Sequence, residues 1–350
     1  DWQVPPGEWA VYRFGHYPTM VRSHPAPEDV ADYSLEVDKM DPEVTIKHWN
    51  GVLAPLKDQF SEYIGNTFNY IWIDSYEAGE QNWSPNFRSD FIRMKGYDPV
   101  PQIILAYERG DSILNFDTHG IRTLEGKPVT ESELFLKDYA EVINRLYQDC
   151  WRLGKEMVNN AGFLLCWEPY SSWRGARFDM AEGVAIPDIP VTEFWVHDES
   201  IIGDETMAEA AAKNNKRIIG AEAFTGMEAT CTFTETPAML KRSADMGFSF
   251  GANLYFLHSW AHNPFGDELQ PGWSFAHYGT HFSRNLTWLK PGKAFFTYLT
   301  RCQMLLQQGS FISRNDSVLH RSTPEVEIFF VRSQENQGMK TYEFPVTGRI

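Results

Sequence analysis

The sequence has few basic residues and no long apolar run, and each shortage excludes a class of protein. Its 350 residues contain 31 Lys and Arg against 47 Asp and Glu, a formal net charge of −16. This balance argues against nucleic-acid binding, which needs clustered Lys and Arg to neutralise phosphates, and against docking on anionic lipid. No apolar run approaches the roughly 20 residues of a membrane-spanning helix. We therefore expect neither a nucleic-acid partner nor a membrane span.

Cysteines are scarce, and glycine-rich phosphate loops are missing. The four cysteines are too widely separated for a CxxC zinc motif; they are Cys150, Cys166, Cys231 and Cys302. We expect them to be small buried side chains rather than disulfides or metal ligands. No GxGxxG or GxxxxGK[ST] loop follows a predicted strand, so we expect no nucleotide and no organic cofactor.

Aromatic residues are abundant instead. The chain has 12 Trp, 15 Tyr and 24 Phe, and aromatics make up 15% of its residues. Trp and Tyr have flat apolar faces with a polar edge, which suits contact with sugar rings, although they also build protein cores. The composition is therefore compatible with a carbohydrate-binding protein.

Short apolar runs alternate with helical patterns along most of the chain. We expect strands at 9–14, 68–74, 103–105, 163–167, 189–195, 217–221 and 252–257. We expect helices at 41–64, 86–95, 131–160, 206–214, 237–246 and 293–308. This alternation predicts an α/β fold, a (β/α)8 TIM-type barrel, with a doubly wound open sheet as the alternative.

The last 30 residues have a different pattern. Two strand-like runs flank a turn-like stretch within 325–346, which predicts a β-hairpin. We interpret 1–320 as the barrel and 321–350 as a hairpin that leads into a truncated β-rich domain.

Acidic residues follow several of the predicted strands. They are Asp74, Glu77, Glu168, Glu193 and Glu222. The carboxyl ends of barrel strands meet at one mouth, where burial and mutual repulsion raise the pKa of at least one acid. Paired carboxylates are typical of glycoside hydrolysis. The same cluster could hold a divalent cation or serve only structure.

Histidines follow the last predicted strand, in the run from His258 to His262. No HExxH zinc motif accompanies them, so hydrogen bonding to sugar hydroxyls, or plain loop packing, is the better interpretation. Among the aromatics near strand ends, two or three are expected to stack on sugar rings.

Several runs of residues together resemble one family. They are WIDSYEAG from Trp72, NWSPNF from Asn82, EPY from Glu168 and AEAFT from Ala221. They resemble glycoside hydrolase family 106, a family of bacterial α-L-rhamnosidases. The likeness implies a (β/α)8 catalytic barrel, flanked by β-rich domains, in a larger secreted or periplasmic bacterial enzyme. It also implies inverting cleavage of terminal α-L-rhamnosyl, or related deoxy-sugar, residues from plant or bacterial polysaccharide, with two glutamates and a bound calcium.

The resemblance also suggests roles for individual residues. Glu168 is expected to be the general acid and Glu222 the base, with Glu77 as a rival for either role. The residues expected to bind the oligosaccharide are Asp74, Asn82, Trp83, Tyr170, Glu193, Trp195, His258 and His262. An inverting pair would have its carboxyl groups roughly 6.5–9.5 Å apart.

One departure from the family pattern leaves alternatives open. The chain reads His262-Asn263-Pro264 where His-Gln-Pro is expected, so a sugar other than rhamnose remains an alternative. The fold also admits a non-catalytic carbohydrate-binding barrel, and a metal-dependent sugar isomerase or lyase.

Overall fold

The computed structural model describes residues 3–13, 15–22, 34–77, 81–108, 131–169, 180–197, 201–202, 204–227, 231–260, 262–270, 272 and 278–309. The chain forms two compact units. The first consists of Asp1–Gln59, Tyr76–Glu156 and Ser171–Asp179; the second consists of Phe60–Ser75, Met157–Tyr170 and Met180–Ile350. All described strands belong to the second unit.

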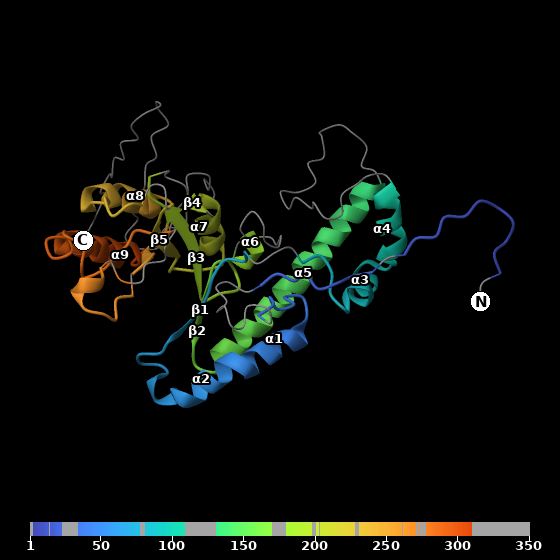
Figure 1. The fold of residues 1–350 in the computed structure, drawn as a ribbon, viewed down its shortest axis with the longest axis horizontal. Coiled ribbons are helices and arrows are strands. Elements are labelled where there is room, and N and C mark those ends of the chain that lie inside the picture. Colours follow the sequence, from blue (N-terminus) through green and yellow to red (C-terminus); the bar gives the residue numbers. More distant parts are fainter. Residues whose placement is uncertain are drawn as a thin grey trace, which may run out of the picture. The chain divides into compact units, whose positions relative to one another are not determined.

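The second unit is built on a curled parallel sheet (Figure 1). Its spatial order is β1 (Tyr70–Ile73), β2 (Leu164–Trp167), β3 (Ile189–Trp195), β5 (Gly220–Thr225) and β6 (Leu254–Leu257). These five strands are parallel, and the short β4 (Ile201–Ile202) pairs antiparallel with β3. The mixed α/β class is confirmed, and the sheet is compatible with a barrel-like fold. Because the strands run in one direction, their carboxyl ends share one edge.

Helices cover this sheet. They are α6 (Met180–Gly183), α7 (Asp204–Lys213), α8 (Pro237–Ser249) and α9 (Lys293–Leu306), with a 3-10 turn at Asp267–Leu269. Helix α8 begins where the Thr236 side chain accepts a hydrogen bond from the Met239 amide. It packs against β3, β5 and α9 (Figure 1). At Gly247 a β-carbon would stand 2.7 Å from the Tyr255 hydroxyl, so the helix approaches β6 closely there.

The core under the sheet is aromatic. Phe194 contacts Phe224 at 5.1 Å and Tyr255 at 5.0 Å between ring centroids, and Phe248 stacks on Tyr255 at 4.5 Å. All four side chains are buried. This packing fixes β3, β5 and β6 against one another and so sets the positions of the residues at their carboxyl ends.

One carboxylate joins the starts of two strands. Asp188 accepts hydrogen bonds from the Leu165 amide at 2.9 Å and from the Asn159 side chain at 2.8 Å. The Asp188 amide in turn donates to the Leu165 carbonyl at 3.0 Å. Asp188 therefore supports the register of β2 beside β3.

The first unit is helical. Its helices are α1 (Pro42–His48), α2 (Ala54–Gln59), α3 (Phe87–Lys95), α4 (Pro99–Glu108) and α5 (Glu131–Asn160), with a π-helical turn at Trp49–Leu53 between the first two. A 3-10 turn at Ser61–Tyr63 follows α2 in the chain. Helix α3 ends at Gly96, whose φ of 80° is in the left-handed region that favours glycine. Four buried rings form the core of α3 and α5: Phe87, Phe91, Phe135 and Tyr139.

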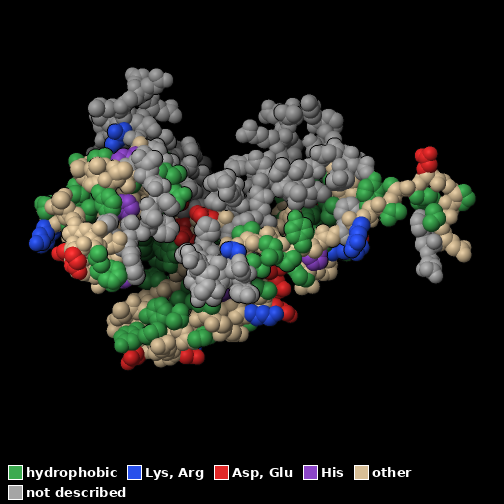
Figure 2. All heavy atoms as spheres, in the orientation of Figure 1, with side chains coloured by type: hydrophobic (Ala, Val, Ile, Leu, Met, Phe, Trp, Pro, Cys, Tyr) green, Lys and Arg blue, Asp and Glu red, His purple; other side chains and the backbone are tan. Residues whose placement is uncertain are grey.

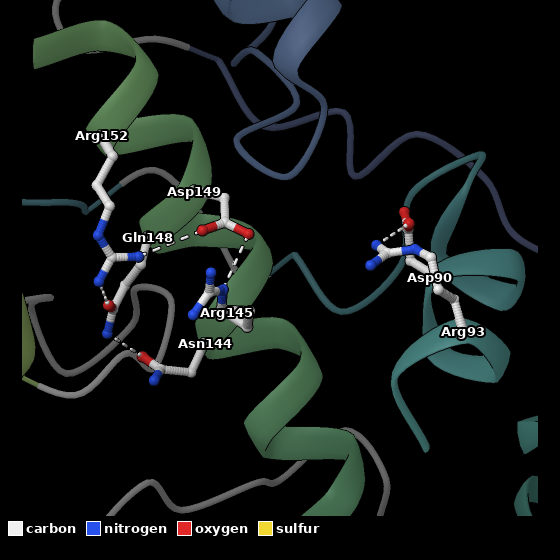
Figure 3. A network of polar contacts seen from close by, with 7 residues as sticks. All are labelled: Asp90, Arg93, Asn144, Arg145, Gln148, Asp149 and Arg152. Carbon is white, nitrogen blue, oxygen red and sulfur yellow. Dashed lines mark hydrogen bonds and ion pairs between the residues drawn. The ribbon is translucent and has the colours of Figure 1, made fainter. Parts of the chain in front are cut away.

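Polar contacts run along α5, from the exposed Arg145 and Asp149 to the buried Gln148 (Figure 3). Arg152 donates to Gln148 at 2.6 Å and to Asp149 at 3.3 Å, while Arg145 donates to Asp149 at 3.0 Å. Gln148 also donates to Asn144 at 3.2 Å. These spacings of three and four residues bring side chains together on one helix face and support a long helix.

Several expected elements are confirmed, and two are wrong. The helix at 131–160 and the strand at 189–195 match α5 and β3. The strand expected at 103–105 lies inside α4, because Pro99 begins a helix whose Val100 amide donates to the Asp98 side chain. Residues 9–13 form no strand, and Val11 is 86% exposed. The hairpin expected within 325–346 lies outside the described residues.

The surface agrees with the acidic composition. On the face drawn in Figure 2, the Lys and Arg side chains of the described residues are scattered rather than gathered into one patch. No helix in the described ranges has the length and apolar character needed to cross a membrane.

Replacing Asp188 with alanine is expected to lower the free energy of unfolding by about 1–3 kcal/mol, because the buried Leu165 amide loses its acceptor. Urea unfolding followed by tryptophan fluorescence measures this change. The control is Asp149→Ala on the exposed face of α5, which is expected to cost less than about 1 kcal/mol. Equal effects of the two substitutions would contradict the role given to Asp188.

Candidate active site

Four acids of the predicted set lie on the sheet of the second unit. Asp74 directly follows β1 and Glu168 directly follows β2, whereas Glu193 and Glu222 lie inside β3 and β5. The strand expected at 217–221 is in fact displaced toward the carboxyl end, at Gly220–Thr225, which puts Glu222 within it. Glu193 and Glu222 are paired in register, so they stand side by side.

Three of these carboxylates converge. Asp74, Glu168 and Glu222 each contribute one oxygen atom to a group in which all the oxygens lie within 4.8 Å of one another. Like charges at this separation repel strongly when they are shielded from water. The cluster is therefore stable only if it holds a proton or a cation.

Glu168 is the most deeply buried member. Its side chain is 0% exposed; one oxygen, Oε2, accepts from the Ser75 amide at 2.9 Å, and Oε1 has no hydrogen-bond partner among the described residues. Burial raises the pKa of Glu168 well above its ordinary value, and hydrogen bonding to Asp74 adds to this rise. The negative charges of Asp74, Glu222 and Glu193 raise it further. Glu168 therefore keeps its proton at a pH where an ordinary glutamate is charged.

Glu222 belongs to a second polar group, with Thr225 and His258. The Thr225 hydroxyl donates to Glu222 Oε1 at 2.6 Å and lies 3.1 Å from His258 Nδ1. His258, which directly follows β6, has this nitrogen 3.3 Å from Glu222 Oε1. Burial lowers the pKa of His258; Asp74 opposes this effect, whereas His281 reinforces it. Thr225 is the site residue that sequence reasoning missed.

A β-bulge brings Thr225 into this group. Alternation along a strand would place residues 222 and 225 on opposite faces. Phe224 has a φ of 70°, and the register of β3 with β5 passes over it, so Trp195 pairs with Thr225. A non-glycine residue in the left-handed region is strained, and such strain gathers at functional sites. The only advance signal was the AEAFT run itself, which the family resemblance had singled out.

The remaining predicted site residues of this unit lie around these groups. Glu193 is buried. Trp195, the last residue of β3, makes an edge contact with Tyr278 at 6.1 Å between ring centroids. His262 is exposed and lies in the segment after β6. Their contacts with a sugar stay predictions.

Other predicted residues belong to the first unit. Glu77 is exposed; the Asn82 carbonyl accepts from the Tyr139 hydroxyl at 2.7 Å; and Trp83 packs on Phe87 at 4.8 Å between ring centroids. Tyr170 lies outside the described residues. The roles expected for these four residues stay predictions.

The carboxylate cluster has the donor set of a hard cation site. Calcium prefers carboxylate and other oxygen ligands at 2.3–2.6 Å. Asp74, Glu168 and Glu222 supply such oxygens, and Glu168 Oε1 is a buried acceptor without a partner in the described residues. These residues fit the calcium ion that the sequence resemblance implies.

Comparisons with known proteins find a family model, a curated relative and a solved structure that match this chain. The family model for glycoside hydrolase family 106, alpha-L-rhamnosidase, matches residues 1–316. A curated relative from Formosa agariphila, provisionally named a beta-glucuronidase, is 32% identical over 318 residues, which are 89% of this chain and 25% of that protein. The solved structure of a rhamnosidase from Novosphingobium sp. PP1Y matches with a TM-score of 0.67 and 25% identity, over 83% of this chain and 26% of that chain.

The chain thus spans about a quarter of the length of each of these two relatives. The family model covers residues 1–316 of this chain. The sheet edge with its carboxylates lies within these residues. On this evidence the chain belongs to glycoside hydrolase family 106, the alpha-L-rhamnosidases.

Proposed function

We propose that this chain is the catalytic region of an enzyme that removes terminal α-L-rhamnosyl, or related deoxy-sugar, residues from plant or bacterial polysaccharide. The observation that carries the proposal is Glu168, a buried carboxyl at the carboxyl end of a parallel strand, next to two further acids. Active sites of α/β barrels lie at this edge. Glycosidases need one carboxyl that is still protonated when the substrate binds.

The proposed mechanism starts with Glu168. Its proton passes to the glycosidic oxygen as the bond to the anomeric carbon breaks, and the sugar ring develops positive charge. The carboxylates of Asp74, Glu193 and Glu222 stabilise that charge, because they lie on the same sheet edge and Glu168 is shielded from water. A water molecule, deprotonated by a second carboxylate, then bonds to the anomeric carbon, and Glu168, now an anion among other anions, takes a proton from solvent and returns to its acid form.

Hydrolysis also needs a second carboxylate, which activates the attacking water. The nearest oxygens of Glu168 and Glu222 are within 4.8 Å, which is less than the roughly 6.5–9.5 Å between carboxyl groups of an inverting pair. Inversion, the outcome implied by the resemblance, therefore points away from Glu222, and among the acids of this sheet we propose Glu193 as the residue that activates water. Glu222, held by Thr225 and His258, is then better suited to orient a sugar hydroxyl or a cation.

Electrostatics favours a neutral sugar. A glucuronide brings its own carboxylate, and an edge with four acids would repel it. A deoxy sugar brings no charge, so the described part of the site fits rhamnose better than glucuronate.

When bound, calcium would neutralise part of the cluster's charge and offer coordination to sugar hydroxyls. Asp74 and Glu222 would hold it, while Glu168 keeps the proton that it donates.

The wider setting of the chain is also a proposal. The two relatives are more than three times as long as this chain, which supports a parent protein with further domains, β-rich ones by the sequence resemblance. We propose that the sheet is part of a full (β/α)8 barrel and that the parent enzyme is secreted or periplasmic.

Substitution of Glu168 by glutamine is expected to slow hydrolysis of an alkyl α-L-rhamnoside by about 100- to 10,000-fold, because the leaving oxygen loses its proton donor. An aryl rhamnoside with an acidic phenol needs less protonation, so its rate should fall much less. The measurement is kcat for both substrates. Glu141→Gln, a change on the exposed face of α5, is the control and should leave both rates unaltered. Equal losses on the two substrates would contradict the acid role.

The same substitution is expected to stabilise the protein at pH 7. In the unfolded chain Glu168 ionises near its ordinary pKa, whereas in the folded protein its raised pKa keeps the proton bound. Stability is therefore lost as the pH rises above the unfolded pKa, by about 1.4 kcal/mol per pH unit until the folded pKa is reached. Glutamine does not ionise, so the variant does not lose this stability. The measurement is the melting temperature of the variant and of wild type, with a chelator, at pH 4 and pH 7. A difference between the two proteins that is the same at both pH values would argue against a buried protonated acid.

Calcium is expected to raise the melting temperature of the wild-type protein, because it binds the folded carboxylate cluster and not the unfolded chain. Asp74→Asn removes one ligand charge and should reduce this shift. Glu141→Gln should leave the shift unchanged. A calcium response that is identical in all three proteins would place calcium elsewhere.

A further inference from the structure

A second cluster of side chains with metal-binding atoms lies in the sheet unit, and the proposed hydrolysis does not use it. His197, Cys231 and Glu235 each contribute one nitrogen, sulfur or oxygen atom, and these atoms lie within 4.8 Å of one another. His197 follows β3, Cys231 follows β5, and Glu235 precedes the Thr236 cap of α8. The end of β3 and the segment between β5 and α8 therefore meet at one point.

The burial of this cluster calls for positive charge. The Glu235 side chain is 3% exposed, and Cys231 is 4% exposed. A carboxylate taken out of water is costly unless a cation or hydrogen-bond donors compensate it. His197 Nε2 lies 3.0 Å from Glu235 Oε1, but this imidazole is a cation only when protonated. A divalent metal ion would supply the charge without depending on that proton.

The backbone around the cluster holds the donor atoms in place. His197 has a φ of 71°, a strained conformation for a residue with a β-carbon. A β-carbon on Gly226 would stand 2.0 Å from the Cys231 sulfur, so only glycine admits the thiol at that position. The Trp288 indole donates to the Glu235 carbonyl at 2.7 Å and fixes the segment before α8.

We propose that His197 Nε2, Cys231 Sγ and Glu235 Oε1 form a binding site for Zn²⁺. Imidazole, thiolate and carboxylate are the ligands of zinc in proteins, at about 2.0–2.3 Å. A tetrahedral ion with such bonds separates its ligand atoms by roughly 3.3–3.7 Å, within the spacing seen here. Three protein ligands leave the fourth position to water. The three-carboxylate cluster has only oxygen donors, so the two sites would select different metals.

The metal would join the end of β3 to the segment between β5 and α8. His197 is more than 30 residues before Cys231 in the sequence, whereas Cys231 and Glu235 belong to the same short segment. A zinc ion that binds all three residues raises the stability of the folded arrangement, because the unfolded chain does not present the ligands together. Cys231, which the sequence analysis expects to be a buried hydrophobe, becomes a metal ligand.

Cobalt substitution tests the site. The whole chain is stripped of metal with a chelator and titrated with Co²⁺, which occupies zinc sites and gives a thiolate-to-cobalt charge-transfer band only when sulfur is bound. We expect this band to saturate at one cobalt per chain and to disappear when Zn²⁺ is added. Cys231→Ser should abolish the band and weaken Zn²⁺ binding by more than about tenfold, whereas Cys302→Ser, a matched change in α9, should retain both.

Two further measurements keep the result unambiguous. His197→Gln removes a ligand from a partly exposed side chain, so a folded variant without the band supports the site even where Cys231→Ser fails to fold. Wild type should keep the band in excess Ca²⁺, and so should Glu168→Gln. A missing band in wild type, a band retained in Cys231→Ser, or its loss in Glu168→Gln would each overturn the proposal.

Discussion

The exclusion of water from the Glu168 carboxyl is the constraint on which the chemistry of this protein depends. A carboxyl with no exposed surface, beside Asp74 and Glu222, can persist only as a neutral acid or as the ligand of a cation. Both states are useful to a glycosidase, and both follow from where β1 and β2 end. The sheet therefore does more than carry the proposed catalytic groups, because its geometry sets the protonation of Glu168.

The positions of these acids depend in turn on apolar packing beneath them. Phe194, Phe224 and Tyr255 join β3, β5 and β6 from the side of α8, and Asp188 sets β2 beside β3. The polar edge can tolerate repulsion because the aromatic core holds the strands together. The free energy gained by burial of the core offsets the cost of gathering carboxylates, as is common for active sites.

Sequence patterns predicted the parts of this fold that depend on local periodicity. The apolar repeat of 131–160 and the continuous apolar run of 189–195 are sufficient to predict α5 and β3, and the acids expected after strands lie on one sheet. Thr225 could not be found in this way, because its place in the site depends on a left-handed residue at Phe224 that no alternation rule anticipates. The run at 103–105 was misread because three apolar residues fit a helix as well as a strand. The cluster around Cys231 shows a similar limit, since His197 is distant from Cys231 and Glu235 in sequence.

Phe224 also restricts how this sequence can change. Its ring fills the core between Phe194, Phe282 and Phe295, while its backbone adopts a conformation that only glycine adopts readily. Glycine would relax the backbone but empty the core, and a smaller L-residue would empty the core and keep the strain. The core favours a large ring at this position, whereas the backbone favours glycine. No single substitution satisfies both demands. Sequence drift through this site would require compensating changes in at least one of the surrounding rings.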